Sequence, residues 1–315
     1  MGWTIDTFLP VSQSFFHPVM WANFGLIGRW VAQAMEPGRL PILILSMPRS
    51  GSSWVGKMLG SAQEALYLRE PINQSMLEHT DLPTLFEVSS RDIASNVRPL
   101  AEDVFAGYPA FDRGIVKQVD QWSLTRRKEK QVIIKEVNPF FYPWLSESFD
   151  FKTIYLVRHP GAVASSFNRL GWRSGLLRCL PAVREQIEER HHESFWAKHG
   201  AAQAIASRTV MDALREQDQR RYQVVRYEDL CRRPEGAFRE LFGSVGLNWS
   251  EQDRERVERH TTATNARREK TYDTRRKSSE MVGAWRDDIS KDQLRDLKEA
   301  YLHYNPPLYA EGWEA

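Results

Sequence analysis

The chain has 315 residues, of which 42% are hydrophobic and 27% are charged, and its formal net charge at pH 7 is +2. This composition predicts a water-soluble globular protein with a single domain spanning 1–315, and so small a net charge gives no reason to expect a nucleic-acid partner. The only cysteines, Cys179 and Cys231, are too few for a disulfide framework or a cysteine metal site, which favours a reducing cytoplasmic compartment.

Residues 1–38 are predicted to form a helical extension ahead of the first strand. Asp6 comes early and no basic segment precedes an apolar core, so this beginning does not resemble a cleavable signal peptide. The stretch 15–35 is apolar and aromatic, but polar residues interrupt it, which makes it a poor membrane-spanning helix. We expect a helix packed against the domain, with peripheral contact between 15–35 and a membrane as the alternative.

A short apolar run at 42–45 is followed by a turn rich in Ser, Gly and Pro at 46–53 and by a helical segment at 54–59. Small residues just before a helix N-terminus let backbone amides approach an anion, and the helix dipole favours negative charge there. Arg49 adds a permanent cation whose fork of donors suits phosphate or sulfate oxygens. The sequence therefore predicts a buried strand that leads into a phosphate-binding loop.

This loop can be read in two ways. The segment 51–57 fits most of the nucleoside-triphosphatase pattern G-x-x-x-x-G-K-S/T, but Met58 stands where that pattern needs a magnesium-binding hydroxyl. A kinase or nucleotidase therefore stays as the alternative, and Gly56 and Lys57 are expected to belong to the helix. In the second reading, the loop resembles the 5′-phosphosulfate loop of the sulfotransferases that use 3′-phosphoadenylyl sulfate (PAPS). That motif matches at all seven positions of Pro48-Arg49-Ser50-Gly51-Ser52-Ser53-Trp54.

Apolar strands and helices alternate along the rest of the chain. The segments 72–130 and 172–215 are more polar and are expected to cover the acceptor. Strands alternating with helices imply an α/β fold with a parallel central sheet flanked by helices, in which ligands bind at the carboxyl ends of the strands. Further strands are predicted at 65–68, 131–134, 152–157 and 222–227. Helices are predicted at 82–88, 93–105, 161–170, 234–245, 251–259 and 291–301, with a long charged helical region, broken once, at 182–217.

Three later segments resemble the same family. Arg158 follows a predicted strand and Ser166 lies eight residues further on, in the next helix; the family's pattern is similar, and there it binds the 3′-phosphate of PAPS. Tyr227 opens a Tyr-Glu-Asp segment that looks like the family's segment near the adenine. A basic stretch resembles the family's C-terminal loop over the 3′-phosphate, although Ser278 replaces a glycine and two extra residues precede Gly283. The residues of this stretch are Arg275, Arg276, Lys277 and Ser278.

The resemblance implies a P-loop-NTPase-like sulfotransferase fold and the transfer of a sulfuryl group from PAPS to a hydroxyl, leaving PAP and requiring no metal. The acceptor would be a small molecule, a lipid or a carbohydrate. Arg49 would stabilise charge on the transferring group, and Trp54 would lie near the adenine. The residues that would hold the 5′-phosphate are Ser50, Gly51, Ser52 and Ser53.

The sequence leaves the catalytic base open. The family's cytosolic aryl and steroid enzymes carry a histidine in a Lys-Thr-His segment, but here the segment is Lys135-Glu136-Val137, so the lysine is kept and the histidine is missing. Carbohydrate sulfotransferases resemble this chain in having a glutamate just after the second strand, which makes Glu70 the predicted base and Glu136 the second choice. Glu70 could instead be the N-terminal carboxylate of a helix that begins at Pro71. Lys135 would stabilise the leaving or transferring group.

Two rival functions stay open beside the sulfotransferase. One is a P-loop kinase or nucleotidase, and the other is a nucleotide-binding module without catalysis. Arg49, Arg158 and Ser166 together favour the enzyme. His191 and His192 lie in a charged helical region and are expected to be solvated. A bacterial cytoplasmic enzyme fits best, and a homodimer is one form that it could take.

Overall fold

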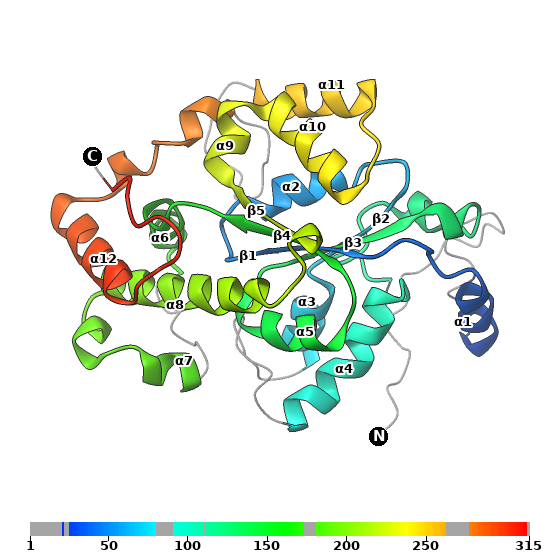
Figure 1. The fold of residues 1–315 in the computed structure, drawn as a ribbon, viewed down its shortest axis with the longest axis horizontal. Helices are drawn as coiled ribbons and strands as arrows, with labels where there is room; N and C mark the ends of the chain where they lie inside the picture. Colours follow the sequence, from blue (N-terminus) through cyan, green and yellow to red (C-terminus); the bar gives the residue numbers. More distant parts are fainter. Residues whose placement is uncertain are drawn as a thin grey trace.

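A five-stranded sheet forms the centre of the computed structural model (Figure 1). Its strands are β1 Ile42–Ser46, β2 Ala65–Arg69, β3 Gln131–Glu136, β4 Lys152–Val157 and β5 Tyr222–Arg226, and each begins where the sequence predicted a strand. Neighbouring strands are all parallel, in the spatial order β2-β3-β1-β4-β5. The expected parallel α/β fold is therefore confirmed. The structure describes residue 21 and the ranges 25–79, 91–109, 111–172, 181–262 and 277–313.

Helices cover both faces of this sheet. The α-helices are α1 Gly25–Ala34, α2 Ser52–Leu59, α3 Pro71–His79, α4 Arg91–Phe105, α5 Tyr142–Ser148, α6 Pro160–Arg169, α7 Pro181–Gln186, α8 Phe195–Arg215, α9 Tyr227–Arg232, α10 Pro234–Val245, α11 Glu251–Thr261 and α12 Lys291–His303. The 3₁₀ turns include η5 Glu189–His192 and η7 Ser278–Met281. In Figure 1, α2, α9, α10 and α11 lie above the sheet, and α3, α4, α5 and α8 lie below it.

The central strand β1 shows why the sheet is buried on both faces. Leu43 and Leu45 belong to the apolar cluster that includes α4, α5 and α8, whereas Ile42 and Ile44 belong to the cluster that includes α2 and α10. All four side chains are fully buried. Successive side chains of a strand point to opposite faces, so a continuous apolar run suits a strand between two helical layers.

The charged region 182–217 is helical with one break, as expected, and the break lies between α7 and α8. The turn η5 lies between α7 and α8, and Ser194 then caps α8 by accepting hydrogen bonds from the amides two and three residues further on, at 3.2 and 3.4 Å. His191, in η5, is buried and its Nδ1 lies 3.1 Å from the hydroxyl of Tyr304. The expectation that His191 is solvated is therefore wrong, because the end of α12 covers it.

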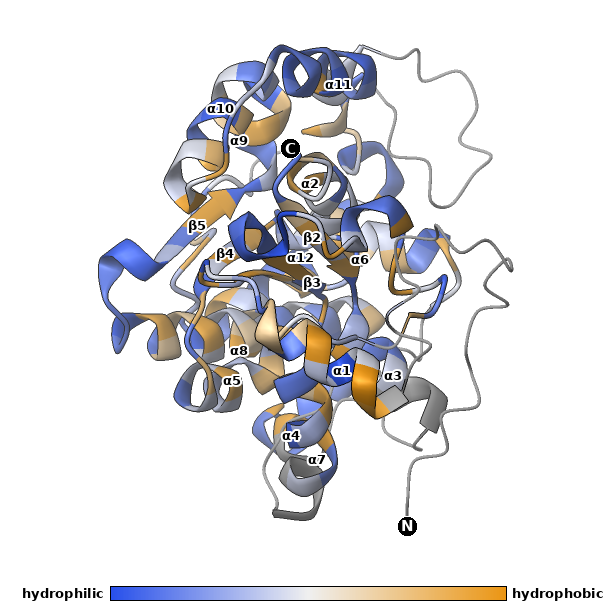
Figure 2. Cartoon of the chain, turned by 90° about the vertical axis from the view of Figure 1, so that its right-hand side faces the viewer, coloured by the Kyte–Doolittle hydropathy of each residue, from blue (hydrophilic) through white to orange (hydrophobic). Residues whose placement is uncertain are grey.

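Helix α1 does not pack through its apolar side as the sequence predicted. Leu26, Ile27 and Trp30 are 86%, 71% and 69% exposed, and Figure 2 shows this hydrophobic surface on α1. The opposite side carries Ala32, which is fully buried, and Arg29 at the flank of the helix donates a hydrogen bond of 3.1 Å to Asp103 of α4. Among the described helices, none combines the length and the apolar character needed to cross a membrane. Residues 1–20 and 22–24 of the predicted N-terminal extension and the helix predicted at 82–88 lie outside the described residues.

Candidate functional site

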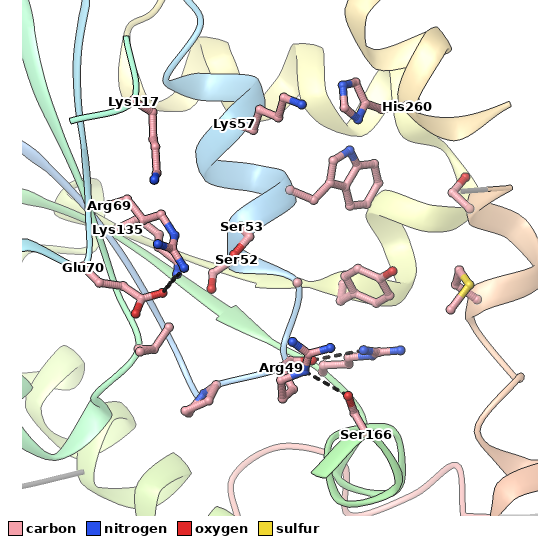
Figure 3. A pocket seen from close by; sticks show the side chains of 18 of the residues that line it. Arg49, Ser52, Ser53, Lys57, Arg69, Glu70, Lys117, Lys135, Ser166 and His260 are labelled. Carbon is pink, nitrogen blue, oxygen red and sulfur yellow. Dashed lines mark hydrogen bonds and ion pairs between the residues drawn. The ribbon is translucent and has the colours of Figure 1, made fainter. Parts of the chain in front are cut away.

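The candidate site follows the carboxyl edge of the sheet. In spatial order this edge carries Glu70 after β2, Lys135 in β3, Arg49 after β1, Arg158 after β4 and Tyr227 after β5. All five side chains line one cavity of about 940 Å³ (Figure 3). Neighbouring strands lie about 4.8 Å apart, so the ends of β2 and β4, three spacings apart, are separated by about 14 Å. The cavity can therefore hold an extended ligand that lies across the sheet.

The loop after β1 presents a helix N-terminus to this cavity. Arg49 and Gly51 have φ angles of 71° and 96°, so the chain turns sharply before α2. Gly51 is the N-cap of α2 and makes no side-chain cap, and the first amides of a helix have no intrahelical acceptor. A Cβ added at Gly51 would lie 2.4 Å from the ring of Tyr227, so glycine is needed for this ring to pack on the loop. The geometry suits an anion at the helix N-terminus.

Positions 56 to 58 serve the packing of α2. A Cβ added at Gly56 would lie 2.4 Å from the hydroxyl of Tyr67, and Met58 is buried in the apolar core. Lys57 is exposed, and it is the one residue of the three that lines the cavity. Position 58, where the triphosphatase pattern needs a hydroxyl for magnesium, faces the core. The structure therefore favours the reading of the loop from Pro48 to Trp54.

Arg49, Arg158 and Ser166 form one cluster beside this loop. The Nε of Arg49 donates to the Oγ of Ser166 at 3.0 Å, and the Nη1 of Arg158 donates to the carbonyl of Arg49 at 3.0 Å. The guanidinium of Arg158 also lies 4.5 Å from the ring centroid of Tyr227, a cation–π contact. The sequence assigned Arg49 to one phosphate and Arg158 with Ser166 to another. The structure joins all three into one basic surface.

The cap of α6 fixes the position of Ser166. The Nδ1 of His159 accepts a hydrogen bond of 3.1 Å from the amide of Gly161, and this bond caps the helix. Burial, together with the charge of Arg286, lowers the pKa of His159 to about 3, so the ring is neutral and its Nδ1 can accept. The same ring stacks on Trp285 with a centroid distance of 4.5 Å. This neutral histidine therefore has a positioning role, away from the cavity lining.

Glu70 and Lys135 form an ion pair at the other end of the cavity. Glu70 has a φ of 51°, and its amide donates to the carbonyl of Lys135 at 2.6 Å. The side chain of Lys135 is 1% exposed and burial lowers its pKa, whereas the side chain of Glu70 is 20% exposed and lines the cavity. A positive φ on a residue other than glycine is strained and persists where surrounding contacts hold it. Here Lys135 holds both the backbone and the carboxylate of Glu70.

Glu136 points away from the cavity. Its carboxylate accepts hydrogen bonds from the amides of Ile72 and Asn73, at 2.7 and 3.4 Å, at the start of α3. The side chain is fully buried, and burial raises its pKa to about 8. Lys135 and Glu136 are neighbours on a strand and therefore face opposite sides of the sheet. Glu136, the second choice of base, is thus not in the cavity, and it takes the place at the start of α3 that the sequence had left open for Glu70.

The part of the cavity beyond Arg158 is aromatic. Trp54 is buried, and its ring meets those of Tyr227 and Phe238 edge-on, with centroid distances of 5.9 and 5.0 Å. Trp54 therefore packs in the core and also lines the cavity. Ser278 lines the cavity too, and its Oγ donates to the carbonyl of Cys231 at 3.1 Å.

The other predicted binding residues divide into three groups. Ser52 and Ser53 line the cavity, whereas Ser50 of the same loop is buried and does not. Lys277 is exposed, pairs with Glu280 at 2.7 Å and lies outside the cavity lining. Arg275 and Arg276 lie outside the described residues.

Several lining residues were not predicted from the sequence. Among the described residues, the lining holds seven Lys or Arg side chains and a single carboxylate, Glu70. Arg69 could have been found, because it ends β2 just before Glu70. Lys117 could not, because it comes from an irregular segment that an antiparallel bridge attaches to β2. In the same described part of the chain, no group of three or more His, Cys, Asp or Glu side chains could hold a metal ion. The lining residues that were not foreseen are Lys57, Tyr67, Arg69, Lys117, Gln118, Val137, Arg169, Trp172, His260 and Met281.

Comparisons with known proteins find sulfotransferases. Residues 41–251 match the sulfotransferase family. Carbohydrate sulfotransferase 5 of Mus musculus is 25% identical over 318 residues, covering 83% of this chain and 78% of the relative. Carbohydrate sulfotransferase 6 of Homo sapiens is 25% identical over 338 residues, covering 87% and 82%. Among solved structures, the sulfotransferase domain from the curacin biosynthetic pathway is similar, with 18% identity, a TM-score of 0.48 and coverage of 85% of this chain and 100% of that domain.

Proposed function

Because this chain belongs to the sulfotransferase family and has its P-loop-like parallel fold, we propose that it transfers a sulfuryl group from PAPS to a hydroxyl of a carbohydrate, leaving PAP and a sulfate ester. The carbohydrate class rests on the relatives named carbohydrate sulfotransferases. The observation that carries the proposal is the cluster of Arg49, Arg158 and Ser166 beside the start of α2, with Glu70 at the other end of the same cavity.

In this proposal the nucleotide lies across β1 and β4. Arg158 and Ser166 bind the 3′-phosphate, and the amides and hydroxyls of Ser52 and Ser53 at the start of α2 bind the 5′-phosphosulfate. Arg49 lies between these two groups, because it contacts Arg158 and Ser166 and stands in the loop just before Ser52 opens α2. A ligand with two separate phosphate positions accounts for a basic surface that extends beyond the loop itself.

The residues near β2 and β3 perform the transfer in this proposal. The carboxylate of Glu70 takes the proton of the acceptor hydroxyl while the hydroxyl oxygen bonds to sulfur and the bond between sulfur and the 5′-phosphate oxygen breaks. Arg49 and Lys135 stabilise the negative charge on the oxygens involved. Lys135 is well suited to this role, because its buried ammonium group acts through a medium of low dielectric constant.

Calorimetry without metal tests the nucleotide part of the proposal. The protein should bind PAP more tightly than ATP or GTP, because only PAP carries the 3′-phosphate. Arg158→Met and Ser166→Ala should each weaken PAP binding, Arg158→Met by about tenfold or more because it loses charge-assisted hydrogen bonds. Tight binding of ATP without binding of PAP would contradict the proposal and favour the kinase or nucleotidase.

Turnover of PAPS tests the base. Glu70→Gln should abolish turnover and leave PAP affinity unchanged, because the amide cannot take the proton. Glu136→Gln is the matched control and should keep turnover, since this side chain faces α3 on the other side of the sheet. An active Glu70→Gln variant would remove Glu70 from the mechanism.

A further inference from the structure

Arg69 and Lys117 form a second basic cluster in the cavity, at the end away from Arg158. Both side chains line the cavity. Arg69 ends the edge strand β2, and the segment that carries Lys117 is bridged to the outer side of that strand. The strand that precedes Arg158 lies three positions away in the sheet. In Figure 3, Arg69 and Lys117 lie on the same side of α2 as Glu70, and Ser166 lies on the other side.

The backbone holds these two side chains on one face of the edge. The amide of Arg69 donates to the carbonyl of Ile115 at 2.9 Å. In antiparallel pairing, Lys117 is then the diagonal neighbour of Arg69 on the same face. The Nη1 of Arg69 also donates to the carbonyl of Gly114 at 3.4 Å, and the Nζ of Lys117 donates to that of Arg113 at 2.6 Å. Burial and the charge of Arg69 lower the pKa of Lys117, which agrees with two cations held close together.

Within the described residues, only Glu70 and Asp112 lie near enough to offset part of the charge of this cluster, and neither makes a close ion pair with it. The Nη2 of Arg69 lies 4.0 Å from the Oε1 of Glu70, but that oxygen already pairs with Lys135. Lys117 makes no ion pair with a described carboxylate, and nearby Asp112 accepts a hydrogen bond from the turn that follows it. An anion between Arg69 and Lys117 would reduce their mutual repulsion and accept charge-assisted hydrogen bonds.

We propose that Arg69 and Lys117 bind an anionic group of the acceptor, a carboxylate or a sulfate, and so select acidic carbohydrates over neutral ones. The inference rests on the proposed function, in which Glu70 marks the position of the reacting hydroxyl. The anionic group then lies close to that hydroxyl, because the guanidinium of Arg69 is 4.0 Å from the carboxylate of Glu70. The phosphates of the nucleotide bind at Arg49 and Arg158, so the two ligands occupy different ends of the cavity.

The test compares neutral and acidic sugars on the protein saturated with PAP. Glucose is paired with glucuronate, and N-acetylglucosamine with its 6-sulfate, in calorimetric titrations at low ionic strength. The acidic member of at least one pair should bind about tenfold more tightly than the neutral one. The double variant Arg69→Met/Lys117→Met should lose this preference and keep its affinity for PAP. The conservative variant Arg69→Lys should retain part of the preference.

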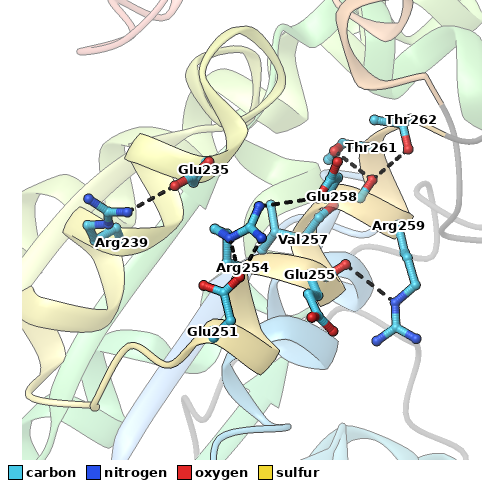
Figure 4. Close-up of polar contacts among 10 residues, drawn as sticks. All are labelled: Glu235, Arg239, Glu251, Arg254, Glu255, Val257, Glu258, Arg259, Thr261 and Thr262. Atoms are coloured by element: carbon cyan, nitrogen blue, oxygen red, sulfur yellow. Dashed lines mark hydrogen bonds and ion pairs between the residues drawn. The ribbon is translucent and has the colours of Figure 1, made fainter.

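Arg239→Met is the matched control, because Arg239 is an exposed side chain of α10 paired with Glu235 (Figure 4). It should leave the preference unchanged. The inference is wrong if acidic sugars bind no more tightly than neutral ones, or if the preference survives in the double variant. Loss of PAP binding in the double variant would assign the cluster to the nucleotide and would also overturn it. If the unaltered protein does not bind PAP, the proposed function fails first and the inference fails with it.

Discussion

On the surface of α10 and α11, arginines meet glutamates one helical turn away, whereas the charges of the cavity come from strand ends far apart in the sequence. Arg239 pairs with Glu235 at 2.9 Å, and Arg254 pairs with both Glu251 and Glu258 (Figure 4). Opposite charges are therefore matched locally on this surface. The described lining of the cavity instead gathers seven cations around one carboxylate.

The two regions differ in what keeps their charges in place. A surface pair forms wherever helical spacing allows it, and solvent screens it, so it adds little to stability. The cations of the cavity repel one another and are held by hydrogen bonds and by strained backbone, since Arg49 and Glu70 both have positive φ angles. Such an arrangement costs folding free energy and is stabilised when anions bind, which ties the cavity to its ligands.

The largest expected effect comes from removing the buried cation of the cavity. Lys135→Met keeps the apolar stem of the side chain but removes the charge beside Glu70. Because a preorganised charge contributes strongly to the rate, kcat for PAPS turnover should fall about 100- to 1000-fold. The thermal midpoint should change by only a few degrees, because methionine suits the buried position and Glu70 keeps some contact with solvent. Kinetic assays and calorimetry measure the two effects.

Lys128→Met is the control for this change, because Lys128 is an exposed lysine outside the cavity lining. It should leave both kcat and the thermal midpoint as they are. Unchanged turnover in Lys135→Met would show that the buried lysine has no part in the transfer. A large fall in the thermal midpoint would show that the Glu70–Lys135 pair serves the fold as well as the reaction.

The next effect contrasts a buried glutamate with an exposed one. Burial raises the pKa of Glu136 from 4.5 to about 8, whereas the hydrogen bond from Arg254 lowers the pKa of Glu251. Between pH 4.5 and about pH 8, the native state keeps a proton on Glu136 that the unfolded state releases. The contribution of this group to stability therefore falls as the pH rises through that range. Glu136→Gln should therefore be more stable than the unaltered protein above pH 8, by a few kcal/mol.

Urea unfolding at pH values below, within and above this window measures the difference. The gain in Glu136→Gln should grow with pH and level off once the wild-type carboxyl is ionised in both states. Glu251→Gln should show no such gain, because a lowered pKa contributes stability at high pH. Parallel pH profiles for Glu136→Gln and the unaltered protein would contradict the buried, protonated state of Glu136.

A glycine of the cavity loop and a glycine of the surface helix α10 should respond differently to substitution by alanine. Gly51→Ala should destabilise the fold by about 1–3 kcal/mol, because φ is 96° there and the new Cβ would meet the ring of Tyr227. It should also weaken PAP binding, since the loop would move. Gly243→Ala in α10 has open space around the new Cβ and should stabilise the helix by up to about 1 kcal/mol. Equal effects in the two variants, measured by urea unfolding, would show that the loop tolerates a side chain.

The strands and the anion loop could be predicted because their signals are local. An apolar run with turn residues after it places both a strand and its carboxyl end, and this was enough to locate Arg49, Glu70 and Arg158 at one edge. Helical spacing placed Ser166 beside Arg158, whereas the structure pairs it with Arg49 of the loop. The sequence could not show toward which side of the sheet each side chain points. Lys135 enters the cavity and Glu136 leaves it because β3 pairs with β1 in one particular register.

Contacts between segments far apart in the sequence are the second feature that could not be predicted. Lys117 reaches the cavity through a bridge between an irregular segment and β2, and His191 is buried because the end of α12 lies over it. Neither partner is visible in the local pattern. For α1 the prediction failed in the opposite sense, because a side expected to be buried is exposed. Hydrophobic spacing predicts an apolar face but does not show which surface covers it.

The smallest expected effect lies on the surface of α11. Arg254→Met removes the ion pairs with Glu251 and Glu258, whose side chains are 67% and 60% exposed. The thermal midpoint should fall slightly at low salt, and the difference from the unaltered protein should vanish at about 1 M salt, where exposed charges are screened. PAP affinity and turnover should stay unchanged. A loss of stability that persists at high salt would show that these ion pairs stabilise the fold. The surface of α10 and α11 and the cavity would then no longer differ in how much their charges matter for folding.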